Sequence, residues 1–205
     1  VIACNTATAA AIDLLRLEHP GLPIIGVEPA LKPSVARSKT GRIGVMATRS
    51  TLASAKFRAL LASQAARASF VVQACDGLAD AIERSAETGD TAETIALCAR
   101  YIRDVGQFGT QKGQIDTLVL GCTHYPFASV QLRALLGPQV QIIDNGEAIA
   151  RQTRRVASAA AHESGASSAA AGSVSLFTTG QPQALQAAAS RWLGLTAAVE
   201  TLSIQ

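Results

Sequence analysis

The sequence is poor in aromatic residues. Its 205 residues include five Phe, two Tyr and one Trp, which is 4% of the chain. Proteins that bind nucleic acids use aromatic stacking platforms or a basic stripe. The net charge is only +3, and the one short basic cluster, Arg151 with Arg154 and Arg155, is typical of a solvated helix face. We therefore expect no nucleic-acid partner.

Long hydrophobic runs are also missing. No uninterrupted apolar stretch approaches the roughly 20 residues that a membrane-spanning helix needs. The first residues lack the basic region, apolar run and cleavage site of a secretory signal. Hydrophobic residues nevertheless make up 48% of the chain, which is typical of a globular protein. We expect a cytoplasmic protein with a sizeable core and no membrane partner.

The four cysteines form no recognisable framework. Their spacing is irregular, there is no C-x-x-C pair, and the Cys-Thr-His triplet at 122–124 supplies at most two of the four ligands of a zinc site. In a chain of this size without a secretion signal, reduced thiols are the better expectation. We therefore expect neither disulfides nor a bound metal.

Short β-branched runs alternate with helical patterns along the chain. The expected strands are Val1–Ala3, Ile24–Val27, Ile43–Met46, Phe70–Gln73, Thr117–Leu120, Val140–Ile143 and one within 173–180. The expected helices are Thr6–Leu17, Thr51–Leu61, Gly77–Ser85, Thr91–Val105, Ala128–Leu136, one from Ala148 and Pro182–Leu193. This alternation predicts an α/β fold with a mostly parallel sheet. Asp90 with Glu93 resembles a capping box, and the low-complexity stretch 157–173 is expected to run from a helix end into a surface loop.

Two cysteines occupy the same kind of turn. Cys4 and Cys122 each follow an apolar run and precede an expected helix. Ligands of open α/β sheets bind beyond the carboxyl ends of the strands, and a helix N-terminus stabilises a thiolate. The backbone N–H groups there also suit a substrate carboxylate, with Asn5, Thr6 and Thr123 as further hydrogen-bond partners.

Two thiols that converge on one crevice suit proton exchange at a chiral carbon. A thiolate on one face removes the proton, and a thiol on the opposite face supplies another, which inverts the centre. A single Cys with a His would instead suggest acyl transfer. A thiol redox pair formed by Cys4 and Cys122 stays open as an alternative.

Five sequence blocks resemble the glutamate racemase family. They are ACNTAT at 3–8, PIIGVEPALKP at 23–33, GVMATRST at 44–51, DTLVLGCTHYP at 116–126 and FTTG at 177–180. The resemblance implies a cofactor-independent enzyme that interconverts L- and D-glutamate, with the D-isomer supplied for peptidoglycan, cell wall biogenesis and cell shape. Aspartate and hydantoin racemases share the general plan and remain an alternative.

The resemblance also implies roles for individual residues. Cys4 takes the proton from the D-isomer and Cys122 takes it from the L-isomer. His124 assists proton handling at Cys122 and binds substrate. Glu83 aligns with an acidic residue of some family members. The other implied substrate-binding residues are Asn5, Thr6, Thr48, Thr51 and Thr123.

The implied architecture has two pseudo-symmetric α/β lobes with the active site in the crevice between them. The first lobe combines 1–28 with 144–205, and the second is 29–143. The family's Asp-Ser-Gly and Pro-Tyr-Gly motifs are not found in this sequence, so we expect an N-terminally incomplete racemase with little or no turnover. A non-catalytic fragment is therefore a second alternative, and the oligomeric state, with a homodimer among the options, stays open.

Cofactor independence is a testable part of this reading. Racemisation by the complete parent enzyme should be unchanged after removal of pyridoxal phosphate and metals, because the charge that develops on the substrate is stabilised by fixed N–H and hydroxyl donors. The measurement is optical rotation of glutamate before and after treatment with hydroxylamine and a chelator. Dependence on either group would contradict the assignment.

Overall fold

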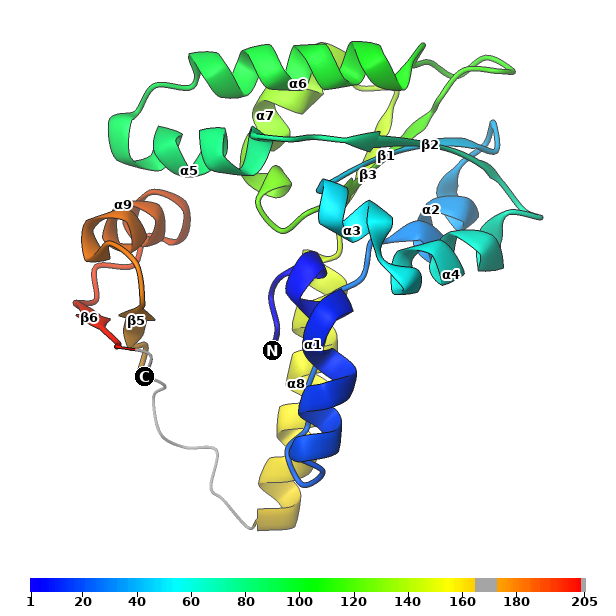
Figure 1. Ribbon diagram of the computed structural model, residues 1–205. Coiled ribbons are helices and arrows are strands. Elements are labelled where there is room, and N and C mark those ends of the chain that lie inside the picture. The colour runs from blue at the N-terminus through cyan, green and yellow to red at the C-terminus, as the bar shows by residue number, and fades with distance from the viewer. Residues whose placement is uncertain (165–172, 204–205) are drawn as a thin grey trace.

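The computed structural model describes residues 1–164 and 173–203 (Figure 1). Its centre is a parallel sheet in the order β2-β1-β3-β4, formed by β1 (Arg42–Ala47), β2 (Ser69–Ala74), β3 (Thr117–Gly121) and β4 (Gln141–Ile143). Crossover helices connect these strands, as parallel pairing requires. The α/β class predicted from the alternation of runs is confirmed.

Strand residues alternate between two cores because successive side chains of a strand point to opposite faces. Met46, Leu118 and Leu120 belong to one core, beneath α5 (Leu78–Thr88), α6 (Ala92–Val105) and α7 (Ser129–Leu136). Val45 and Val119 belong to the other, against α2 (Leu31–Arg37) and α4 (Ala55–Gln64). The two helical layers cover opposite faces of the sheet in Figure 1.

The strand order reverses between β1 and β3. From β1 the chain moves outward to β2, then returns to pair β3 with the other side of β1. A crevice opens at such a switch point, beyond the carboxyl ends of the two strands. Ala47 pairs with Gly121 at these ends, so the segments that begin at Thr48 and Cys122 leave the sheet side by side.

The remaining elements lie outside the sheet. Helices α1 (Asn5–Glu18) and α8 (Gly146–Ser164) project from the same side of it (Figure 1). They line a common cavity of about 400 Å³. The two-stranded parallel sheet β5 (Leu176–Thr178) and β6 (Val199–Thr201) carries α9 (Pro182–Leu193), which packs on α5. The proposed lobe division, 1–28 with 144–205 against 29–143, stays a prediction.

Two expected strands are absent from the described residues. Val1–Ala3 and Ile24–Val27 run alongside one another, but Ile2 N–H to Ile25 O (2.8 Å) is their only backbone hydrogen bond. The Thr8 hydroxyl donates to Ile2 O (3.2 Å) and accepts from Val27 N–H (3.0 Å). These two hydrogen bonds take the place of the backbone hydrogen bonds that paired strands would form. The prediction of strands here was wrong because one side chain satisfies the backbone groups that a strand would pair.

Helix boundaries differ from expectation in two further places. The single helix expected over Thr51–Leu61 is divided into α3 (Arg49–Ala53) and α4, because Ser54 caps α4 by accepting from Phe57 N–H (3.1 Å). Asp90 accepts from Ala92 N–H (2.8 Å), but Glu93 pairs with Arg84 and does not complete a capping box. The sequence pattern also missed α2 and β6.

Helix α8 extends to Ser164, and the rest of the low-complexity stretch, 165–172, lies outside the described residues. In the part of the chain that the structure describes, no helix is both long enough and apolar enough to cross a bilayer.

Asp116 fixes the end of the sheet opposite the switch point. Its buried carboxylate accepts hydrogen bonds from Ser38 Oγ (2.6 Å), Lys39 N–H (2.6 Å), Thr40 N–H (2.9 Å) and Thr117 Oγ1 (2.9 Å). Burial acts to raise the pKa of Asp116, but these hydrogen bonds outweigh it and hold the pKa below its ordinary value. The carboxylate therefore joins the loop before β1 to the start of β3.

Replacing Asp116 should destabilise the fold. Asp116→Asn should lower the free energy of unfolding at pH 7 by about 2–3 kcal/mol, because four donors lose a charged acceptor. Since folding depresses this pKa, the contribution is present above the ordinary carboxyl pKa and is lost as pH falls through the folded value. The difference between the proteins in urea denaturation should accordingly shrink below about pH 4.

The matched control is Asp104→Asn. Asp104 is 39% exposed at its side chain and pairs with Arg100 at 3.7 Å on the helix surface. Such a pair contributes about 0–1 kcal/mol, so this variant should unfold close to the wild type. Equal losses in the two variants would contradict the role assigned to Asp116.

Candidate functional site

Each of the two cysteines precedes a helix, but only Cys122 lies at the end of a strand, because residues 1–3 form no strand. Cys4 is exposed and is the N-cap of α1, where its thiol accepts from Ala7 N–H at 3.4 Å. Cys122 follows β3 directly and is 8% exposed. A short 3-10 helix, η1 (Tyr125–Ala128), comes first after Cys122, and the helix expected over Ala128–Leu136 follows it as α7. All four cysteines, which lie within the described residues, are free thiols.

A single hydrogen bond joins the two turns. Thr123 Oγ1 donates to the carbonyl oxygen of Ala3 at 3.0 Å, across 120 residues of sequence. Ala3 precedes Cys4 and Thr123 follows Cys122, so the backbone segments that carry the two thiols are in direct contact. This bond joins the two turns, whereas the arrangement of the two thiols on opposite faces of a substrate stays a prediction.

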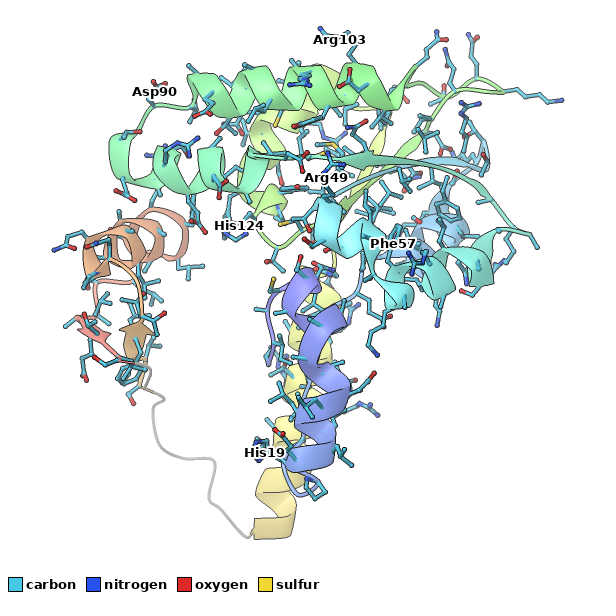
Figure 2. All side chains as sticks on the ribbon, in the orientation of Figure 1. His19, Arg49, Phe57, Asp90, Arg103 and His124 are labelled. Atoms are coloured by element: carbon cyan, nitrogen blue, oxygen red, sulfur yellow. The ribbon has the colours of Figure 1, made fainter. Side chains whose placement is uncertain are left out.

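Behind Cys122 lies a row of polar groups. Cys122 Sγ is 3.8 Å from His124 Nδ1, and His124 Nε2 is 2.5 Å from Glu83 Oε1. His124 projects below α5, between α9 and the start of α1 (Figure 2). A carboxylate that holds one imidazole nitrogen fixes the ring so that the other nitrogen faces the thiol. Glu83, the least secure of the sequence candidates, is thus in contact with His124.

The environment of Cys122 opposes ionisation. Burial raises the pKa of the Cys122 thiol, and the nearby Cys4 and Glu83 act in the same direction. Backbone N–H groups of His124 and Tyr125 lower it, but the net shift is upward. The expectation that a helix N-terminus makes Cys122 a ready thiolate was therefore wrong, because desolvation outweighs the N–H groups.

Three threonine hydroxyls meet beside these turns. Thr6 Oγ1 lies 2.9 Å from Thr48 Oγ1 and 3.0 Å from Thr51 Oγ1, and Thr48 donates to Thr51 at 2.9 Å. Thr6 comes from the first turn of α1, whereas Thr48 is the N-cap of α3 and accepts from Thr51 N–H. These hydroxyls join α1 to the segment that follows β1.

Asn5 is set apart from the other candidates. It is 5% exposed, and neither its amide nitrogen nor its carbonyl oxygen has a hydrogen-bond partner among the described residues. It lines a cavity of about 20 Å³ with Thr51 and Phe57. That volume is enough for about one water molecule. A buried amide without a partner is costly, so this position favours an additional polar group.

A cavity on the far side of His124 is lined largely by residues with no role predicted from the sequence. This cavity of about 500 Å³ is bordered by Glu83, His124, Thr178, Gly180 and Trp192, among others. Phe127, three residues after His124, stacks on Trp192 with ring centroids 4.2 Å apart and an interplanar angle of 11°. The FTTG block was the only signal that pointed here. Among the described residues, no group of three or more His, Cys, Asp or Glu side chains is placed to hold a metal ion.

Known proteins of related sequence match most of this chain. The family model described as Asp/Glu/Hydantoin racemase matches residues 1–153. The chain belongs to this family. It is 42% identical to the glutamate racemase of Herpetosiphon aurantiacus over 182 residues, which are 89% of this chain and 68% of that protein. It is 45% identical to the glutamate racemase of Pseudomonas aeruginosa over 161 residues, which are 78% of this chain and 58% of that one.

Solved racemase structures share the fold. The Escherichia coli glutamate racemase, crystallised with L-glutamate and the activator UDP-MurNAc-Ala, superposes with a TM-score of 0.80 at 28% identity. The match covers 100% of this chain and 74% of that one. The Bacillus anthracis glutamate racemase RacE1 gives 0.77 at 29% identity, over 98% and 72% of the two chains. This racemase chain thus spans between about half and three quarters of the relatives it matches.

The unequal exposure of the two thiols predicts unequal reactivity. Iodoacetamide at pH 7 should label Cys4 first, and labelling of Cys122 should increase as pH rises above 9, because burial raises the pKa of that thiol. Peptide mass spectrometry after timed quenching measures both sites in one sample. Equal rates at the two sites would contradict the buried, protonated state of Cys122.

Proposed function

We propose that this protein is a glutamate racemase that uses Cys4 and Cys122 as its two acid/base groups. The observation that carries the proposal is the Thr123–Ala3 hydrogen bond, which brings the two cysteine turns together. The row of Glu83, His124 and Cys122 on one side supports it further. Two acid/base groups on opposite faces of a carbon suit inversion of that carbon.

The proposed reaction has two proton transfers. With D-glutamate, the Cys4 thiolate removes the Cα proton while the Cys122 thiol donates a proton to the opposite face. With L-glutamate the roles are reversed. The negative charge that develops is shared with the substrate carboxylate, where hydroxyl and N–H donors stabilise it. Thr6, Thr48 and Thr51 supply such hydroxyl donors in this proposal.

In this proposal, the roles of Cys122 and His124 depend on which enantiomer is the substrate. Because its pKa is raised, Cys122 is held as a neutral thiol, which suits proton donation. To act as a base it must first lose its proton, and His124, held by Glu83, is the nearest acceptor. Asn5 and Thr123 complete the proposed substrate-binding set. Asn5 is buried without a hydrogen-bond partner among the described residues, so in this proposal an additional polar group in its cavity connects its amide to the substrate.

The proposal extends to the use of the product and to the place where the substrate binds. D-Glutamate formed in the cytoplasm would supply peptidoglycan synthesis, and the substrate would bind between lobes 1–28 with 144–205 and 29–143. The oligomeric state is not part of the proposal, and a homodimer is one state that a measurement of mass in solution would identify. Aspartate and hydantoins are the competing substrates, because the family model covers racemases of all three classes.

Isotope exchange tests this function directly. Each glutamate enantiomer is incubated in heavy water with this chain, and with the chain joined to the upstream segment of the Herpetosiphon relative. Optical rotation and deuterium at Cα are followed by polarimetry and NMR. We expect inversion with uptake of deuterium in the joined form and little or none in this chain. In the joined form, Cys4→Ser and Cys122→Ser should each lower the rate about 10²- to 10⁴-fold, since a hydroxyl is a much weaker acid than a thiol.

Cys98→Ala is the matched control. Cys98 is fully buried on α6 within the hydrophobic core, and the structure gives it no place in the site. The rate of this variant should stay close to that of the wild type. Absence of exchange in both forms of the chain would refute the proposal, and faster exchange with aspartate or a hydantoin would reassign the substrate.

A further inference from the structure

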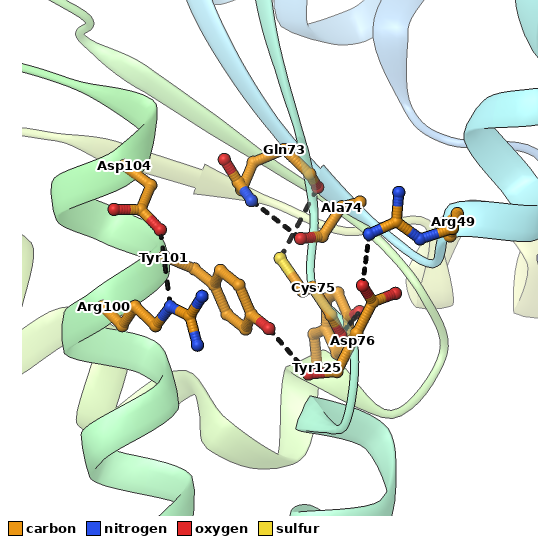
Figure 3. Close-up of polar contacts among 9 residues, drawn as sticks. All are labelled: Arg49, Gln73, Ala74, Cys75, Asp76, Arg100, Tyr101, Asp104 and Tyr125. Carbon is orange, nitrogen blue, oxygen red and sulfur yellow. Dashed lines mark hydrogen bonds and ion pairs between the residues drawn. The ribbon is translucent and has the colours of Figure 1, made fainter.

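The turn after β2, residues 75–77, is held by hydrogen bonds and an ion pair from three other segments. Tyr101 of α6 donates its hydroxyl to the carbonyl oxygen of Asp76 at 2.7 Å, and Arg49 forms an ion pair with the Asp76 carboxylate (Figure 3). Cys75 N–H donates to Ala47 O at 2.9 Å, at the end of β1. Helix α5 begins immediately after this turn, at its N-cap Gly77, and carries Glu83.

A second tyrosine reaches the same turn from the site itself. Tyr125 directly follows His124, is fully buried, and donates its hydroxyl to the carbonyl oxygen of Cys75 at 3.3 Å. Its own N–H donates to Cys122 O at 3.2 Å, which closes the turn that holds the thiol. Burial raises the pKa of Tyr125, so the phenol remains a hydrogen-bond donor across the working pH range.

Tyr125 therefore links two segments that must meet for the proposed chemistry. One segment carries Cys122 and His124, and the other leads into α5 and Glu83. Besides the His124–Glu83 contact, Tyr125 to Cys75 is the one hydrogen bond between these segments within the part of the chain that the structure describes. The Tyr125 ring also packs in the core beneath α5, and this packing holds the 122–125 loop against that core.

We propose that Tyr125 is a positioning residue, whose hydrogen bond to the Cys75 carbonyl holds His124 within reach of both Glu83 and Cys122. The proposal rests on the proposed racemase function for its catalytic consequence, but the geometric part stands on its own. Loss of the hydroxyl would free the 122–125 loop from the turn that begins α5. Misplacement of a catalytic group by a fraction of an ångström to one ångström lowers rates steeply, while substrate binding elsewhere is retained.

The test compares Tyr125→Phe with Tyr101→Phe. Both variants remove a buried phenol hydroxyl from successive carbonyls of one turn, but Tyr101 does not belong to the loop that carries Cys122 and His124. In the form of the enzyme that turns over, Tyr125→Phe should lower kcat about tenfold with little change in KM, and Tyr101→Phe should lower it less than about twofold. Urea midpoints should shift by similar amounts in the two variants.

A spectroscopic measurement on this chain does not require turnover. Long-range ¹H–¹⁵N spectra of ¹⁵N-histidine protein report the hydrogen bonding of each ring nitrogen, and the His124 signals are those missing from His124→Asn. The Nε2 signal of Tyr125→Phe should move most of the way toward its position in Glu83→Gln. In Tyr101→Phe it should keep its wild-type position.

The outcomes separate the two proposals. A wild-type Nε2 signal in Tyr125→Phe, or an equal shift in Tyr101→Phe, would overturn the positioning role. A shift confined to Tyr125→Phe supports it even if no form of the protein racemises glutamate, in which case the proposed function alone fails. Where there is turnover, an unchanged kcat in Tyr125→Phe also overturns the positioning role.

Discussion

The pairing of β1 with β3 is the constraint on which the site depends. Ala47 and Gly121 face each other at the ends of these strands, and the segments that follow carry Thr48 and Cys122. The approach is so close that a Cβ atom on Gly121 would lie 2.9 Å from Ala47 Cβ and 3.0 Å from Met46 O. Only glycine permits this separation without a shift of the backbone. The distance between the two polar segments is therefore set by the sheet.

Burial and hydrogen bonding act against each other at Cys122. Burial of the thiol makes its thiolate costly, because the charged form loses hydration, and this raises the pKa of Cys122. In the proposed mechanism His124 accepts the proton of this thiol. Glu83, 59% exposed at its side chain, keeps one end of the polar row in contact with solvent. Cys4, by contrast, is exposed, and its thiol accepts a hydrogen bond from Ala7 N–H at 3.4 Å. The two thiols of the pair are thus supported by different means.

Local patterns predicted the α/β class, most helices and the turn at Cys122, because strand and helix periodicity and the residues at strand ends are local properties. They failed where a single side chain replaced a ladder, as Thr8 does, and where Ser54 interrupted a helix. The contact of Glu83 with His124 depends on how α5 packs, and the place of Trp192 depends on how α9 docks. The raised pKa of Cys122 depends on burial. These are long-range properties that no short sequence window contains.

The hydrogen bond from Thr123 to Ala3 also bears on how the protein folds. It joins positions 120 residues apart, so the loop it closes includes the whole central sheet apart from β4. Closing such a loop is entropically unfavourable until the intervening elements have packed. The sheet can form from more local pairings, whereas the turns that carry Cys4 and Cys122 are joined only when this 120-residue hydrogen bond forms. In the proposed mechanism, acid/base chemistry by the two thiols is thereby restricted to chains that have completed folding.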